Sequence, residues 1–266
     1  MTAGSDVLRR RDVLRRRVDG PRLTLTLNRP DVHNALNVEL LDALGEAVRA
    51  AAEDAAVRYV VIDAAGTSFC AGADLEWMRA AASATREENE ADAARMADTL
   101  EAMVRCPKPV IARVHGAALA GGMGIVAACD LVAAAPHAVF GLTEVRLGLV
   151  PAMVFPFLLR RVSPHHLRWA ALTGERFGPQ VAREMGLVNE VADDVDRAIE
   201  QWAGGLLTGA PGAQARVKAL FRAVPGLTWE AARAYTVELI AEVRAGPEGQ
   251  EGMRAFLEKR RPSWTP

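Results

Sequence analysis

One segment near the middle of the chain, residues 108–151, limits the fold more than any other part of the sequence: KPVIARVHGAALAGGMGIVAACDLVAAAPHAVFGLTEVRLGLVP. Its apolar runs at 110–114, 131–133 and 139–141 are short, which favours buried strands. The run at 121–129 begins with a glycine pair and favours a short helix. Short strands that alternate with helices indicate an α/β architecture whose sheets are mostly covered.

The rest of the chain divides into a mixed part and a helical part. Before the central segment, the apolar spacing predicts a hairpin at 13–27, a strand at 59–63, and helices at 37–52, 75–82 and 86–104. After about residue 160 the strand signals fade, and helices are predicted at 164–172, 179–185, 194–208, 212–224, 228–244 and 246–258. We therefore expect a flexible tail at 1–11, a core with the active site at 12–200, and a helical region at 201–266 that packs between subunits.

Composition excludes several classes of protein. Half of the 266 residues are hydrophobic, which is enough for a sizeable core. The net charge of −1 argues against nucleic-acid binding, because phosphate contacts need an excess of Lys and Arg on one face. Charged residues interrupt the apolar run at 110–135, which argues against a membrane span. The three cysteines have no metal-ligand spacing, so we expect buried thiols, no metal and a cytoplasmic location.

Two glycine-containing segments could bind an anion through the backbone. Gly121 and Gly122 open the predicted helix, where free N–H groups and the helix dipole favour negative charge. Taken alone, the pair equally indicates close packing of a helix on a strand. The loop at 71–74 could supply a second N–H donor, and two donors together are what an oxyanion hole needs.

Glu144 is a lone carboxylate at the end of a predicted strand, with apolar residues on both sides. In an apolar wall the pKa of a carboxyl group rises, which suits proton transfer near neutral pH. The alternative is a surface glutamate that pairs with Arg146.

Five motifs, in this order, resemble the crotonase (enoyl-CoA hydratase/isomerase) superfamily: NRPDVHNALN, SFCAGADLEWM, KPVIARVHGAALAGGMGIVAACDL, FGLTEVRLGLVP and EGQEGMRAFLEKRRP. The likeness runs from about residue 23 to residue 262. It implies a spiral of repeated strand–strand–helix units with a helical carboxyl-terminal region, and homotrimers that often pair into hexamers. It also implies an acyl-CoA thioester as substrate, with no cofactor beyond the coenzyme A of that substrate.

The resemblance also implies a role for individual residues. The oxyanion donors would be the backbone N–H groups of Ala73 and Gly121, and Glu144 would exchange a proton with the carbon alpha to the thioester. The residues implied to bind the substrate and its CoA moiety are Ala71, Gly72 and Asp74 in the loop, Gly124 in the helix, and Phe256 and Lys259 near the carboxyl terminus.

Gly124 departs from the pattern of the best-known hydratases, which carry a first catalytic glutamate at that position. We expect the missing side chain to leave room for a bulkier acyl group or for a water molecule. The simplest mechanism, in which two glutamates hold water between them, is then in doubt.

Three hypotheses about function stay open. The first is a hydratase that adds water to an α,β-unsaturated acyl-CoA; local motifs resemble the bacterial 3-methylglutaconyl-CoA hydratase-like branch of leucine degradation, which also lacks the first glutamate. The second is an enoyl-CoA delta-isomerase, for which one glutamate suffices. The third, a non-catalytic CoA-binding or RNA-associated protein, is disfavoured because Ala73, Gly121 and Glu144 are all present.

Overall fold

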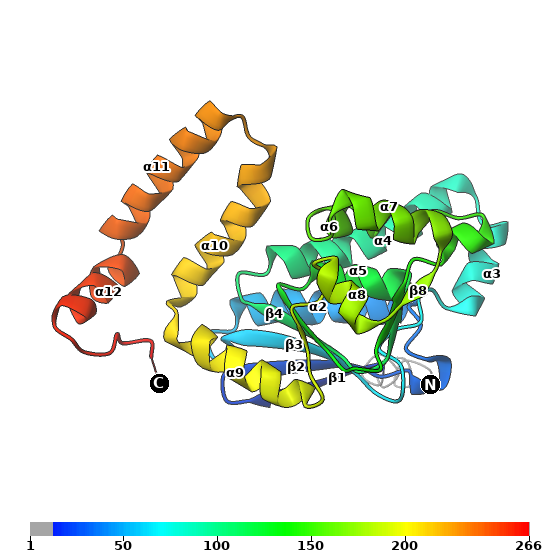
Figure 1. Ribbon diagram of the computed structural model, residues 1–266, viewed down its shortest axis with the longest axis horizontal. Coiled ribbons are helices and arrows are strands. Elements are labelled where there is room, and N and C mark those ends of the chain that lie inside the picture. The colour runs from blue at the N-terminus through cyan, green and yellow to red at the C-terminus, as the bar shows by residue number, and fades with distance from the viewer. Residues whose placement is uncertain (1–12, 266) are drawn as a thin grey trace, which may run out of the picture.

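A six-stranded sheet forms the centre of the molecule (Figure 1). The computed structural model describes residues 13–265, so the tail predicted at 1–11 lies outside the described residues. In order across the sheet, the strands are β1 (Leu14–Asp19), β2 (Arg22–Leu27), β3 (Tyr59–Ala64), β4 (Val110–Val114), β6 (Leu131–Ala134) and β9 (Glu190–Val191). β1 and β2 form the predicted antiparallel hairpin, and every later pair in this sheet is parallel.

A second, smaller sheet makes the chain spiral. It contains β5 (Ala117–Leu119), β7 (Val139–Gly141) and β8 (Arg176–Phe177). β4 belongs to the large sheet, β5 to the small one, and α5 (Gly121–Ala128) follows. β6 and β7 repeat this order before the 3-10 helix η2 (Glu144–Leu147) and α6 (Phe155–Leu159). The predicted α/β fold of strand–strand–helix units is confirmed.

Both faces of the large sheet are buried, because alternate residues of each strand face opposite sides. Ile62, Ala112 and Val132 belong to the main core, which α2 (Val38–Glu53), α4 (Arg86–Arg105) and α5 cover. Their neighbours Val61, Ile111 and Ala133 pack on the other face, against α9 (Val195–Thr208). The remaining helices are η1 (Pro30–Val32), α3 (Leu75–Ser83), α7 (Pro164–Thr173), α8 (Pro179–Glu184), α10 (Pro211–Ala223), η3 (Val224–Gly226), α11 (Trp229–Ala245) and α12 (Pro247–Leu257).

The carboxyl-terminal helices form an arm that projects from the core (Figure 1). We call α10, α11 and α12 the C-terminal arm. The division predicted at 200/201 falls inside α9, which packs on the sheet, so the structure puts the start of the arm after Gly209. The arm is anchored by Lys218 of α10, whose buried ammonium group binds Asp130 and donates to the carbonyl of Lys108 at 2.9 Å.

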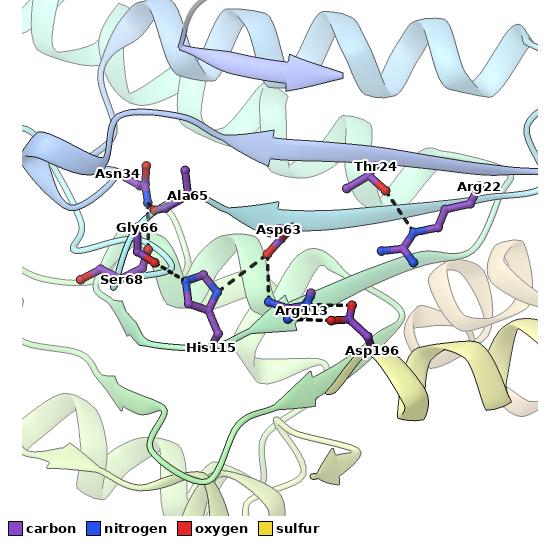
Figure 2. Close-up of polar contacts among 10 residues, drawn as sticks. All are labelled: Arg22, Thr24, Asn34, Asp63, Ala65, Gly66, Ser68, Arg113, His115 and Asp196. Atoms are coloured by element: carbon purple, nitrogen blue, oxygen red, sulfur yellow. Dashed lines mark hydrogen bonds and ion pairs between the residues drawn. The ribbon is translucent and has the colours of Figure 1, made fainter. Parts of the chain in front are cut away.

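Arg113 of β4 fixes α9 to the sheet (Figure 2). Its guanidinium group donates two hydrogen bonds to Asp196, of 2.9 and 2.8 Å, and also lies 3.4 Å from Asp63 of β3. Such a bidentate pair fixes both distance and orientation.

Within residues 13–265 no helix is long and apolar enough to cross a bilayer, and no group of three His, Cys, Asp or Glu side chains could hold a metal ion.

Candidate active site

A cavity of about 180 Å³ lies where three segments of the chain meet. Complete ligand pockets usually measure about 300–1,000 Å³, so this one would take only the reactive end of a larger molecule. Glu144 is the one ionisable side chain among the residues that line it. The lining consists of Leu36, Ala73, Trp77, Ala93, Met96, Ala120, Gly121, Glu144, Val150, Pro151, Ala152, Met153 and Val154.

The backbone amide of Ala73 is left unpaired by the way its loop is held. Gly72 accepts a hydrogen bond from the N–H of Leu36 at 2.7 Å, and Asp74 donates to the carbonyl of Leu36 at 2.9 Å. Leu36 therefore bonds to the residues on both sides of Ala73, as in a parallel ladder, and the amide of Ala73 points away from it. No residue within 13–265 accepts a hydrogen bond from that amide.

Asn34 holds this arrangement in place, although no pattern in the sequence marked it as a functional residue. The side chain is fully buried and donates to the carbonyls of Ala65 at 2.7 Å and Ser68 at 2.8 Å (Figure 2). Its oxygen accepts from the amide of Arg29 at 2.8 Å. Asn34 thus explains part of the NRPDVHNALN motif: it ties the segment that carries Leu36 to the loop after β3.

Gly121 and Gly122 serve two different purposes. A Cβ on Gly122 would lie 2.5 Å from the carbonyl oxygen of Cys70, so this glycine is required by close packing. Gly121 lines the cavity as the first residue of α5, where N–H groups have no partner inside the helix. None of the residues 13–265 accepts a hydrogen bond from its amide. A Cβ there would meet Leu36 at 2.7 Å.

Glu144 begins η2, three residues after β7. Its Oε2 is buried and has no hydrogen-bond partner within the described part of the chain. Burial raises the pKa of the Glu144 carboxyl group above its usual range, and a hydrogen bond from its own backbone amide offsets part of this rise. Arg146 is exposed and makes no ion pair with any carboxylate among residues 13–265, so the hypothesis of a surface pair is wrong.

The expected space beside Gly124 is not there. A Cβ on Gly124 would lie 2.4 Å from Cγ1 of Val154 and 3.1 Å from Cδ1 of Leu100. Val154 is 3% exposed and lines the cavity, whereas Gly124 does not. The prediction that Gly124 leaves room for an acyl group or a water molecule is therefore wrong, because a side chain thirty residues further along the chain fills that volume.

The other loop residues support the site from outside the cavity. Ala71 donates to the carbonyl of His33 at 3.0 Å. Asp74 caps α3 by accepting from the amide of Glu76, and it binds Arg29 at 2.8 Å. Burial raises the pKa of the Asp74 carboxyl group, but these hydrogen bonds lower it more, so its pKa lies below the usual range.

Two of the predicted binding residues lie away from the cavity. Phe256 belongs to α12 and Lys259 follows it, at the end of the C-terminal arm, which lies at the far end of the molecule from α3 (Figure 1). Neither lines the cavity, and Phe256 is 83% exposed. Within one chain they are not brought together with Glu144. Trp77, by contrast, lines the cavity and joins α3 to α4 through a 2.8 Å hydrogen bond to Asp92.

The contact between Gly124 and Val154 can be tested by stability. We expect Gly124→Ala to lower the free energy of unfolding by about 1–3 kcal/mol, since overpacking displaces its neighbours. In a protein that already carries Val154→Ala, the further change Gly124→Ala should cost much less, because the smaller side chain at position 154 leaves room for the added methyl group. Urea unfolding measures all of these variants. The control is Gly205→Ala in α9, where nothing lies within 4 Å of the added carbon. Wild-type stability of Gly124→Ala would contradict the packing described here.

The buried Glu144 carboxylate should also make stability depend on pH. Its folded-state pKa is raised, so above that pKa the ionised group destabilises the folded state, and below its ordinary value of 4.5 the penalty disappears. We expect Glu144→Gln to raise the melting temperature at pH 7, with a gain that shrinks as the pH falls. Thermal unfolding at several pH values tests this against the exposed control Glu46→Gln on α2. A gain independent of pH would contradict it.

Comparisons with known proteins agree with this geometry. The family model described as enoyl-CoA hydratase/isomerase matches residues 23–266. The chain is 36% identical over 251 residues to the 2,3-dehydroadipyl-CoA hydratase of Escherichia coli K12, covering 91% of this chain and 94% of that protein.

Two solved structures have the same fold over nearly the whole chain. The enoyl-CoA hydratase from Shewanella pealeana is 34% identical with a TM-score of 0.94, covering 99% of this chain and 100% of the other. The enoyl-CoA hydratase from Mycobacterium smegmatis is 40% identical with a TM-score of 0.89, covering 95% and 98%. The chain therefore belongs to the enoyl-CoA hydratase/isomerase family, and it is an enzyme of that family.

Proposed function

We propose that this protein is an enoyl-CoA hydratase in which the thioester oxygen lies between the amides of Ala73 and Gly121. The observation that carries the proposal is the convergence of two unpaired amides and one carboxylate on a single, otherwise apolar cavity. Two fixed donors stabilise the enolate-like oxygen that forms when a proton is added or removed next to a thioester. Loss of one such donor typically costs about 3–4 kcal/mol in the barrier.

Glu144 can carry both proton transfers of a hydration. As the oxygen of water bonds to the β carbon, a proton passes from the water to the carboxylate. The same proton then passes to the α carbon, so that one carboxylate suffices and ends in its original state. The raised pKa of the Glu144 carboxyl group suits it to this exchange near neutral pH. The name of the related 2,3-dehydroadipyl-CoA hydratase supports hydration at such a double bond.

A delta-isomerase is the second candidate, and one observation favours it. Val154 occupies the place beside Gly124, and among the residues that line the cavity only Glu144 is ionisable. An isomerase needs one group that takes a proton from one carbon and returns it to another. The related proteins that are named hydratases support the hydratase over the isomerase.

The substrate proposal is 3-methylglutaconyl-CoA, and it rests on the likeness of local motifs to that branch of hydratases. The filled space beside Gly124 gives it no support.

The proposed chemistry requires no cofactor beyond the coenzyme A of the substrate. The three cysteines are free and buried, which supports the proposed cytoplasmic location.

A paired assay with Glu144→Gln tests the reaction. We expect the wild type to remove the conjugated absorbance of 3-methylglutaconyl-CoA and to produce none from a straight-chain 3-enoyl-CoA; the reverse would establish an isomerase. Glu144→Gln should lose nearly all turnover while acyl-CoA binding, measured by calorimetry, survives, because the variant keeps both amide donors. Glu46→Gln is the matched control. Substantial turnover in Glu144→Gln would rule out Glu144 as the acid/base.

We also propose that the C-terminal arm assembles the chain into a trimer or a hexamer. Large apolar side chains on the arm are 76–83% exposed, namely Phe221, Trp229, Phe256 and Leu257. Exposed apolar groups of this size are typical of protein interfaces. A second copy could then bring Phe256 and Lys259 to the nucleotide end of the CoA.

Sedimentation analysis tests the assembly. We expect a mass three or six times that of one chain, and a shift toward monomer in Trp229→Asp because the charge would be buried in the interface. Val18→Asp, on the exposed side of β1, is the control and should leave the mass unchanged. A monomeric wild type would disprove this proposal.

A further inference from the structure

Ala120 has a backbone conformation that alanine rarely adopts. Its φ is +48° and its ψ is −116°. His33, another residue with positive φ, has a ψ of +35° and so lies in the ordinary left-handed region. The combination at Ala120 costs free energy for any residue with a Cβ, and such strain persists only where the surroundings enforce it.

Neighbouring hydrogen bonds enforce this conformation. The amide of Ala120 donates to the carbonyl of Gly141 at 2.9 Å, which ties it to the end of β7, three residues before Glu144. The carbonyl of Ala120 accepts from the amide of Met123 at 2.9 Å. Both sides of the residue are thus held.

The strained dihedral sets the direction of the Gly121 amide. The N–H of Gly121 belongs to the peptide group that joins it to Ala120, and the ψ of Ala120 rotates that group. A return of Ala120 to an ordinary conformation would turn the peptide and point this N–H elsewhere.

The methyl group of Ala120 also lies beside Gly72, the residue before the other amide donor. It lies 3.1 Å from the position that a Cβ on Gly72 would occupy, and Gly72 directly precedes Ala73. Gly72 itself has a φ of +104°. The two residues that precede the two unpaired amides are therefore neighbours.

We propose that Ala120 is a positioning residue that aims the amide of Gly121 and fixes its separation from the amide of Ala73. This inference rests on the proposed function, since it assumes that both amides bind the thioester oxygen. Ala120 acts through these amides and takes no part in proton transfer.

Ala120→Gly tests the proposal, because glycine accepts the same dihedrals and the variant should fold. It removes both the methyl contact and the restriction on the peptide. With 3-methylglutaconyl-CoA as substrate, we expect kcat to fall about tenfold and KM to stay within about twofold of the wild-type value. This loss of kcat is smaller than the roughly 100–1,000-fold loss that follows removal of a whole donor. The second readout is the infrared C=O stretch of bound acetyl-CoA labelled with ¹³C at the carbonyl, whose lowering reports hydrogen bonding to that oxygen. Ala120→Gly should lose part of that lowering.

The control is Ala135→Gly, which removes a buried methyl group directly after β6, from the cluster that packs against α9. It should keep the wild-type kcat and carbonyl frequency. Ala120→Gly with the wild-type kcat and frequency would overturn the proposal, and so would a fall in kcat with the frequency unchanged. If the wild type lowers the carbonyl frequency of bound acetyl-CoA but hydrates no enoyl-CoA, only the proposed reaction is contradicted. The effect of Ala120→Gly on that frequency would still decide the role of Ala120.

Discussion

Three short strand segments lie in register, and the position of the active site depends on that register. Cys70 pairs with Ala118, and Ala118 pairs in turn with Phe140. Ala73 lies three residues after Cys70, and Gly121 lies three residues after Ala118. Glu144 lies four residues after Phe140. Gly121 and Glu144 begin a helix, and Ala73 lies two residues before α3. Successive turns of the spiral therefore bring Ala73, Gly121 and Glu144 to the same cavity.

Close backbone contact makes this convergence possible. Gly116 could not carry a Cβ, because that atom would lie 2.1 Å from the carbonyl oxygen of Thr67, and Gly122 is equally confined by Cys70. Side chains at these positions would push the turns of the spiral apart. The amides of Ala73 and Gly121 would then separate, so the small residues of the central segment determine the geometry of the site through packing.

The sequence predicted what local patterns determine. Apolar spacing and capping residues located nearly every helix, and the family motifs brought Ala73, Gly121 and Glu144 forward as one site. The strands β5, β8 and β9 were not predicted, because two or three residues carry little periodic signal; of the described strands this short, β7 alone was predicted, from its apolar run. The roles of Val154 and Asn34 were not predicted either, because their partners lie about thirty residues away in the sequence. Spacing within one element contains no information about such contacts.

Glu144 is the only carboxylate among the residues that line the cavity, and Val154 fills the space beside Gly124, which determines what controls the ionisation of Glu144. Two neighbouring carboxylates raise each other's pKa by repulsion, whereas a single one depends on its solvation. Burial is the cause that raises the pKa of Glu144 here, with no charged neighbour contributing. Trp77, Met96 and Val154 line the cavity with Glu144, and their apolar side chains contribute to the burial that disfavours the charged form of its carboxyl group. Burial in the cavity thus raises the pKa of the Glu144 carboxyl group without a second carboxylate among the lining residues.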